Sequence, residues 1–145
     1  MRFPHYGNYT LDISGNVLEV FATGAWNLKT AHMFVEEMHE LTLRFKDKPW
    51  AALMDGRRWV LSTSECQQCL TEAIKVNISN GLRCSAYVLD SGMVKRAQLE
   101  HTHPAKDHSF ALRGYERAYF SHYFEGLNYL HQHGFSPIKE IGDKG

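Results

Sequence analysis

The apolar residues of this chain fall into two kinds of run, short runs typical of strands and longer runs with helical spacing. Residues 9–13 and 17–22 flank a Ser-Gly-Asn turn at 14–16, which predicts a β-hairpin. The apolar runs at 50–54 and 85–89 are nearly continuous, as is typical of strands buried on both faces. The pattern therefore predicts a hairpin followed by two central strands.

Apolar positions spaced three and four residues apart predict the helices. Asn27 is expected to cap a long helix that stops at the Lys-Asp-Lys-Pro segment 46–49. A second helix is expected over 64–80, where an Asn-Gly pair is typical of a helix end. A short helix is expected over 93–100 and a last one, rich in aromatic residues, over 116–133.

This order of elements predicts a single α/β domain. It would have an N-terminal β-hairpin, then β-α repeats, and a four- to five-stranded mixed sheet with a parallel centre and packed helices. A short final strand is expected at 110–112. The domain should span 1–135, with 136–145 as a polar C-terminal tail.

Composition narrows the classes of function. Lys plus Arg and Asp plus Glu number 16 each, so the net charge is zero and nucleic acid is not an expected partner. No apolar stretch approaches the roughly 20 residues that span a bilayer, and the start of the chain lacks the apolar run of a signal peptide. Three cysteines without disulfide spacing fit reduced thiols, so a cytoplasmic location is expected. Cys66 and Cys69 form a C-x-x-C motif, but both lie on the apolar stripe of their helix and are expected to face the core.

Two aspartates follow the predicted central strands. Asp55 comes directly after 50–54, and Asp90 comes directly after 85–89 with Ser91 beside it. The carboxyl ends of neighbouring parallel strands lie at one edge of a sheet, where ligands often bind. The two carboxylates are therefore candidates for holding Mg²⁺ or accepting a phosphoryl group, unless each one only shapes its own turn.

Basic and hydroxyl side chains lie close to Asp55 in the sequence. Arg57 and Arg58 follow it, and Ser62, Thr63 and Ser64 precede the second helix. One of these hydroxyls is expected to cap that helix. A phosphate would be favoured at the same helix end, which makes phosphorylation an additional hypothesis.

The hairpin start, the strand that ends in 53–55 and the hydroxyl cluster after it resemble a known family. They look like STAS domains of the anti-sigma factor antagonist type, and most like the SpoIIAA-like branch that is often grouped with STAS/SEC14 proteins. The resemblance covers about 9–133. It implies that Asp55 matches the family's first aspartate and that Ser64 lies near the phosphorylatable serine, whereas Thr63 stands where a second aspartate is usual.

A histidine-rich segment offers a second kind of chemistry. His101, His103 and His108 lie close together in sequence and next to Asp107. Imidazole and carboxylate groups bind Zn²⁺, but the spacing matches no defined metal signature. Scattered surface histidines are the favoured interpretation, and neither a metal nor another cofactor is expected.

The favoured function is a non-catalytic STAS-like regulatory or binding module. Its site would lie near the junction of the third strand and second helix, at Asp55, Arg57, Arg58, 62–64 and 90–91, with a protein or a small anionic or apolar ligand as partner. The alternatives are a small metal- or carboxylate-dependent enzyme that uses Asp55, Asp90 or the His101–His108 loop, and a homodimer subunit of a larger assembly.

Overall fold

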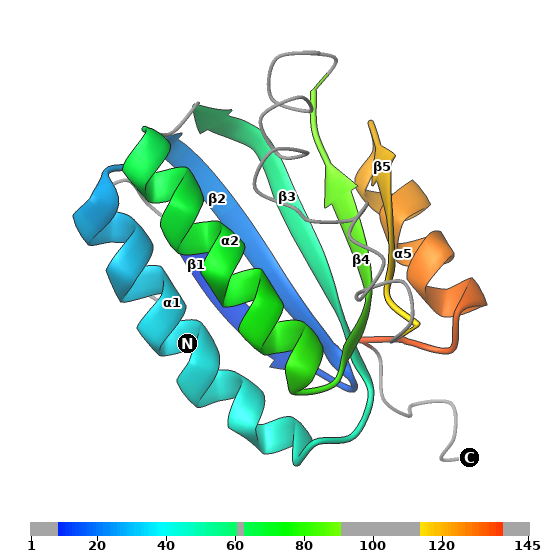
Figure 1. Ribbon diagram of the computed structural model, residues 1–145. Coiled ribbons are helices and arrows are strands. Elements are labelled where there is room, and N and C mark those ends of the chain that lie inside the picture. Colours follow the sequence, from blue (N-terminus) through cyan, green and yellow to red (C-terminus); the bar gives the residue numbers. More distant parts are fainter. Residues whose placement is uncertain (1–8, 61–62, 91–113, 138–145) are drawn as a thin grey trace.

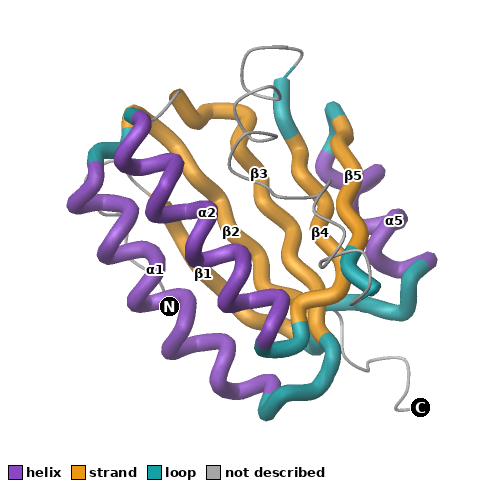
Figure 2. The backbone as a smooth tube through the Cα atoms, viewed as in Figure 1, coloured by secondary structure: helices purple, strands orange, loops and turns teal. Residues whose placement is uncertain are grey.

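A single five-stranded sheet forms the centre of the protein. The structure is a computed structural model that describes residues 9–60, 63–90 and 114–137. In chain order its elements are β1 (Tyr9–Ser14), β2 (Val17–Ala25), α1 (Leu28–Thr42), the 3₁₀ helix η1 (Leu43–Phe45), β3 (Trp50–Val60), α2 (Ser64–Ser79), β4 (Leu82–Val88), β5 (Glu116–Phe120) and α5 (Tyr123–Gln132). The strands lie side by side in the order β1-β2-β3-β4-β5 (Figures 1 and 2).

The strand directions confirm the predicted mixed sheet. β1 and β2 pair antiparallel as a hairpin, whereas β2, β3, β4 and β5 are parallel to one another. Met54 lies opposite Tyr87, and Asp55 lies opposite Val88, so the two predicted central strands are parallel neighbours. Their carboxyl ends therefore share one edge of the sheet.

The helices cover the two faces of the sheet unequally. Helices α1 and α2 lie side by side over one face, and α5 lies over the other (Figure 1). The larger core fills the space under α1 and α2 and contains Trp26, Phe34, Trp50 and Trp59. A smaller core under α5 is formed by Val17, Ala51, Leu53, Cys84, Ala86, Val88, Leu130 and Phe135.

A side-chain hydrogen bond caps the N-terminus of each of the two long helices. The Oδ1 atom of Asn27 accepts a hydrogen bond of 2.8 Å from the backbone N–H of Thr30. The Oγ1 atom of Thr63 accepts one of 3.2 Å from the N–H of Cys66. Each bond satisfies an N–H that the first helical turn leaves open, a contribution of about 1 kcal/mol. The predicted caps at Asn27 and in the 62–64 cluster are confirmed.

Two predicted boundaries were wrong. β3 does not end at Met54 but runs on through Asp55 to Val60, because the Asp-Gly pair forms a bulge inside the strand instead of a turn. The predicted helix over 116–133 begins only at Tyr123. Residues 116–120 form β5 instead, since they include Tyr119 and Phe120, which suit a strand, and they pair along β4.

Two predicted elements lie outside the described residues, and one predicted domain boundary stays a prediction. The expected strand at 110–112 and helix at 93–100 lie outside the described residues. The boundary at residue 135 stays a prediction, although the N–H of Ser136 still donates 2.9 Å to Oδ1 of Asn16 in the hairpin turn. None of the helices in the described ranges has the length and apolar character needed to cross a lipid bilayer.

Candidate functional site

A β-bulge interrupts the pairing of β2 and β3 near their carboxyl ends. Phe21 lies opposite Asp55, but Thr23 lies opposite Arg58, so β3 contains one residue more than β2 over this stretch. A bulge of this kind bends the strand and redirects side chains, and bulges are frequent next to binding sites. Gly56 occupies the bulge in a buried position, where an added Cβ atom would lie 3.3 Å from the side chain of Leu89.

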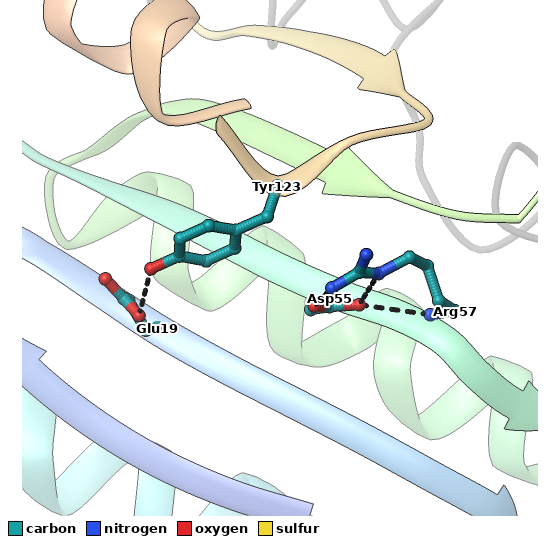
Figure 3. A network of polar contacts seen from close by, with 4 residues as sticks. All are labelled: Glu19, Asp55, Arg57 and Tyr123. Atoms are coloured by element: carbon teal, nitrogen blue, oxygen red, sulfur yellow. Dashed lines mark hydrogen bonds and ion pairs between the residues drawn. The ribbon is translucent and has the colours of Figure 1, made fainter. Parts of the chain in front are cut away.

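Asp55 and Arg57 form a clamp across the bulge. The Asp55 carboxylate is only 7% exposed and accepts three hydrogen bonds from Arg57 (Figure 3). They come from the backbone N–H at 3.2 Å, from Nε at 3.0 Å and from Nη2 at 2.7 Å. This ion pair raises the pKa of the Arg57 guanidinium, chiefly through the hydrogen bonds to Asp55. The carboxylate therefore holds the bulge and the arginine in place.

An open hollow of about 610 Å³ lies above this clamp. Its lining comes from two strands, with Phe21, Ala22 and Thr23 on β2 and Asp55, Arg57 and Arg58 on β3. The charges of Asp55 and Arg57 cancel each other. Arg58 is exposed and forms no ion pair with any residue that the structure describes. The hollow therefore carries one uncompensated positive charge.

An aromatic residue from α5 borders the same face of the sheet. The Tyr123 ring stacks on Phe21, with centroids 6.2 Å apart, and its hydroxyl donates 3.0 Å to Oε1 of Glu19 (Figure 3). Burial raises the pKa of Tyr123 to about 12. Burial also raises the pKa of Glu19, against the opposing effect of the Tyr123 bond and with a smaller contribution from Asp12. The acidic groups thus lie further back on β1 and β2, away from Arg58.

The sequence matches no protein-family model, and no curated protein matches it significantly. Among solved structures, the chain is similar to an uncharacterized protein of the DUF3478 family from Shewanella loihica PV-4, whose crystal structure has a SpoIIAA-like fold. The TM-score is 0.61 and the identity 11%, over 84% of this chain and 93% of that one. The chain has a SpoIIAA-like fold.

The SpoIIAA-like arrangement brings only some of the predicted site residues together. Asp55, Arg57 and Arg58 share the hollow. Thr63 and Ser64 begin α2, which lies over the opposite face of the sheet, and the Thr63 hydroxyl is engaged as the helix cap (Figure 1). These two hydroxyls therefore do not line the hollow.

The remaining candidates lie at other places or outside the described residues. Ser64 is exposed, as a phosphorylation site must be, and its modification stays a prediction. Asp90 is exposed two residues beyond the end of β4, at the same sheet edge as Asp55. Ser62, Ser91, His101, His103 and His108 lie outside the described residues. Within the ranges 9–60, 63–90 and 114–137, no group of His, Cys, Asp and Glu is arranged to hold a metal ion.

The C-x-x-C motif occupies the core side of α2 in this SpoIIAA-like fold, as predicted. Cys66 is fully buried, and its thiol donates to the carbonyl oxygen of Asn27 at 3.4 Å. Cys69 is half-buried with its Sγ 3.8 Å from Nδ1 of His32. Burial raises the pKa of the Cys69 thiol, which is the opposite of what a redox-active cysteine needs.

Sequence reasoning missed three residues of this face, namely Glu19, Phe21 and Tyr123. Glu19 left a signal, because it is a charged residue inside the apolar run of β2. Phe21 gave no separate signal, because it reads as one more apolar residue of the same run. Tyr123 was placed in the aromatic face of a longer helix, and its distance of 104 residues from Glu19 hid the contact.

Proposed function

We propose that this protein is a non-catalytic binding module whose hollow takes a small ligand with an anionic group. A carboxylate or phosphate would pair with the guanidinium of Arg58. The observation that carries this proposal is the open hollow with one uncompensated arginine at the carboxyl end of parallel strands. Guanidinium groups suit such anions because they donate two parallel hydrogen bonds.

The state of Asp55 favours binding over catalysis. A general base or a metal ligand needs lone pairs that the substrate or ion can reach. Asp55 already accepts three hydrogen bonds from Arg57 and is nearly buried. The carboxylate is better suited to hold the shape of the site than to act on a substrate.

Phe21 supports an aromatic or apolar part in the same ligand. Its ring is 36% exposed at the wall of the hollow and is held by stacking on Tyr123. A flat group beside this ring would bury apolar area from both partners. Phenyl phosphate and benzoate combine the two features and serve as probes, with inorganic phosphate for the anion alone.

The test compares two arginines of equal charge. Isothermal titration with phenyl phosphate is run on the wild type, on Arg58→Gln and on Arg44→Gln. Arg44 is an exposed residue of η1, which precedes the amino end of β3, whereas the hollow lies near the carboxyl ends of β2 and β3. We expect Arg58→Gln to weaken binding at least about fivefold, as the loss of a charge-assisted bond implies, and Arg44→Gln to leave binding unchanged.

The affinity of the wild type should also fall as salt is raised, because the contact is exposed to solvent. The proposal would be contradicted if the two substitutions weakened binding equally, or if neither of them changed the affinity. Hydrolysis of phenyl phosphate to phenol and phosphate that disappears in Asp55→Asn would support the enzyme alternative instead.

A further inference from the structure

Thr23 lies beside Arg58 on the wall of the hollow. The two residues are directly opposite each other in the pairing of β2 with β3, just past the bulge, and both line the hollow. Neighbouring strands are about 4.8 Å apart, so the two side chains start from adjacent points of the sheet. Phe21 precedes Thr23 by two residues and therefore points to the same face. A hydroxyl thus adjoins both the aromatic ring and the uncompensated guanidinium.

The Thr23 hydroxyl is open to the contents of the hollow. The backbone at this half-buried residue is fixed, since its carbonyl oxygen accepts a hydrogen bond of 3.2 Å from Nε1 of Trp26. In the described part of the chain the hydroxyl oxygen has no hydrogen-bond partner, yet it is not one of the buried unpaired polar atoms. It is therefore accessible to solvent. A threonine hydroxyl can both donate and accept, whereas a guanidinium only donates.

Carboxylates and phosphate esters differ in what they offer to this hydroxyl. A carboxylate has two oxygens in one plane, and a guanidinium can bind both of them through parallel hydrogen bonds. A phosphate monoester has three terminal oxygens around a tetrahedral centre. When two of them meet the guanidinium of Arg58, the third lies outside that plane and can accept from a hydroxyl at its side. Arg58 and Thr23 together thus offer a phosphate one hydrogen bond more than they offer a carboxylate.

We propose that the hollow selects phosphate monoesters over carboxylates, and that Thr23 is the residue that distinguishes them. This inference rests on the proposed function, because it needs the anion to bind at Arg58. The ligand is then a small aromatic or apolar phosphate ester. Its phosphate is held by Arg58 and Thr23, and its ring lies beside Phe21.

The test uses phenyl phosphate and benzoate at about pH 7.5, where the ester is mostly a dianion. Isothermal titration is run on the wild type, on Thr23→Val and on Thr23→Ser. Valine keeps the branched shape that a strand favours and removes only the hydroxyl. We expect Thr23→Val to weaken phenyl phosphate binding at least about fivefold and benzoate binding less than about twofold, because only the phosphate loses a hydrogen bond. Thr23→Ser keeps the hydroxyl and should retain the preference of the wild type.

Thr10→Val is the matched control. Thr10 is half-buried on β1, opposite Phe21 on the same face of the sheet, and does not line the hollow. This substitution should leave both affinities unchanged. None of these variants alters the charge of the protein. The second charge of the ester therefore cancels when the affinities of one probe are compared across the variants.

Two results would overturn this inference and leave the proposed function standing, provided that binding still depends on Arg58. One is a Thr23→Val variant that weakens both probes equally or neither of them. The other is tighter binding of benzoate than of phenyl phosphate by the wild type. If the wild type binds neither probe, the inference and the proposed function fail together. Thr23→Ala, which also removes the hydroxyl, gives the same comparison if the valine variant does not fold.

Discussion

Replacing Asp55 with asparagine would test whether this carboxylate shapes the hollow or acts on its contents. The substitution keeps the size of the side chain and one acceptor for the backbone N–H of Arg57. It removes the negative charge and one of the two side-chain bonds to the guanidinium. Arg57 then becomes a second uncompensated cation beside Arg58.

The two expected effects differ in sign. The Arg57 side chain is 44% exposed, so the ion pair is screened by solvent and its loss should lower the free energy of unfolding by only about 1 kcal/mol. For an anion about 6 Å from the removed charge, Coulomb's law with an effective dielectric constant between about 20 and 80 gives about 0.7 to 3 kcal/mol. Screening favours the lower end, which corresponds to roughly a threefold gain in affinity.

The assay is titration calorimetry with phenyl phosphate, together with urea unfolding of the same samples. Asp47→Asn serves as the charge-matched control, because Asp47 is exposed in the loop before β3 and has a positive φ of 65° that asparagine tolerates. We expect tighter binding in Asp55→Asn only. Weaker binding in that variant would refute the reasoning and show that the carboxylate itself contacts the ligand.

Two further predictions concern stability. Burial raises the pKa of Glu19, so the folded state holds this proton more tightly and loses stability as the pH rises above the ordinary value of 4.5. Glu19→Gln should therefore raise the free energy of unfolding at pH 7, and this gain should vanish as the pH falls below 4.5. A lower free energy of unfolding for the variant at pH 7, measured by urea unfolding, would contradict the prediction. An added Cβ at Gly81 (φ +110°) would lie 2.9 Å from a backbone oxygen, whereas one at Gly134 (φ +91°) would meet nothing within 4 Å. Gly81→Ala should therefore lower the free energy of unfolding by about 2 kcal/mol more than Gly134→Ala, because the clash adds to the backbone strain. Equal losses in the two variants would show that the contact at Gly81 does not matter.

The sequence predicted those elements whose signals are local. The hairpin, the Asn27 cap and the second helix follow from turn residues, capping residues and apolar spacing within a few positions. The parallel pairing of the central strands followed from their continuous apolar character. Each of these features depends on neighbours in sequence, which is why the SpoIIAA-like fold could be anticipated.

The site was harder to predict because its shape depends on pairing between distant segments. Asp55-Gly56 carries the signature of a turn, yet β3 pairs with β4 as far as Asp55 and with β2 on both sides of the bulge, so the strand continues. Nothing near Tyr123 in the sequence indicates that its hydroxyl reaches Glu19 across the sheet. The predicted cluster therefore retained its residues on β3 but not the aromatic wall beside them.

Side chains alternate along β3, so neighbouring residues face opposite sides of the sheet. Met54 lines a small cavity between the sheet and the helices α1 and α2, whereas Asp55, the next residue, lines the hollow on the other side. Only the thickness of one peptide backbone separates the two compartments at this point. A change in the twist of this stretch would therefore move the walls of both compartments together.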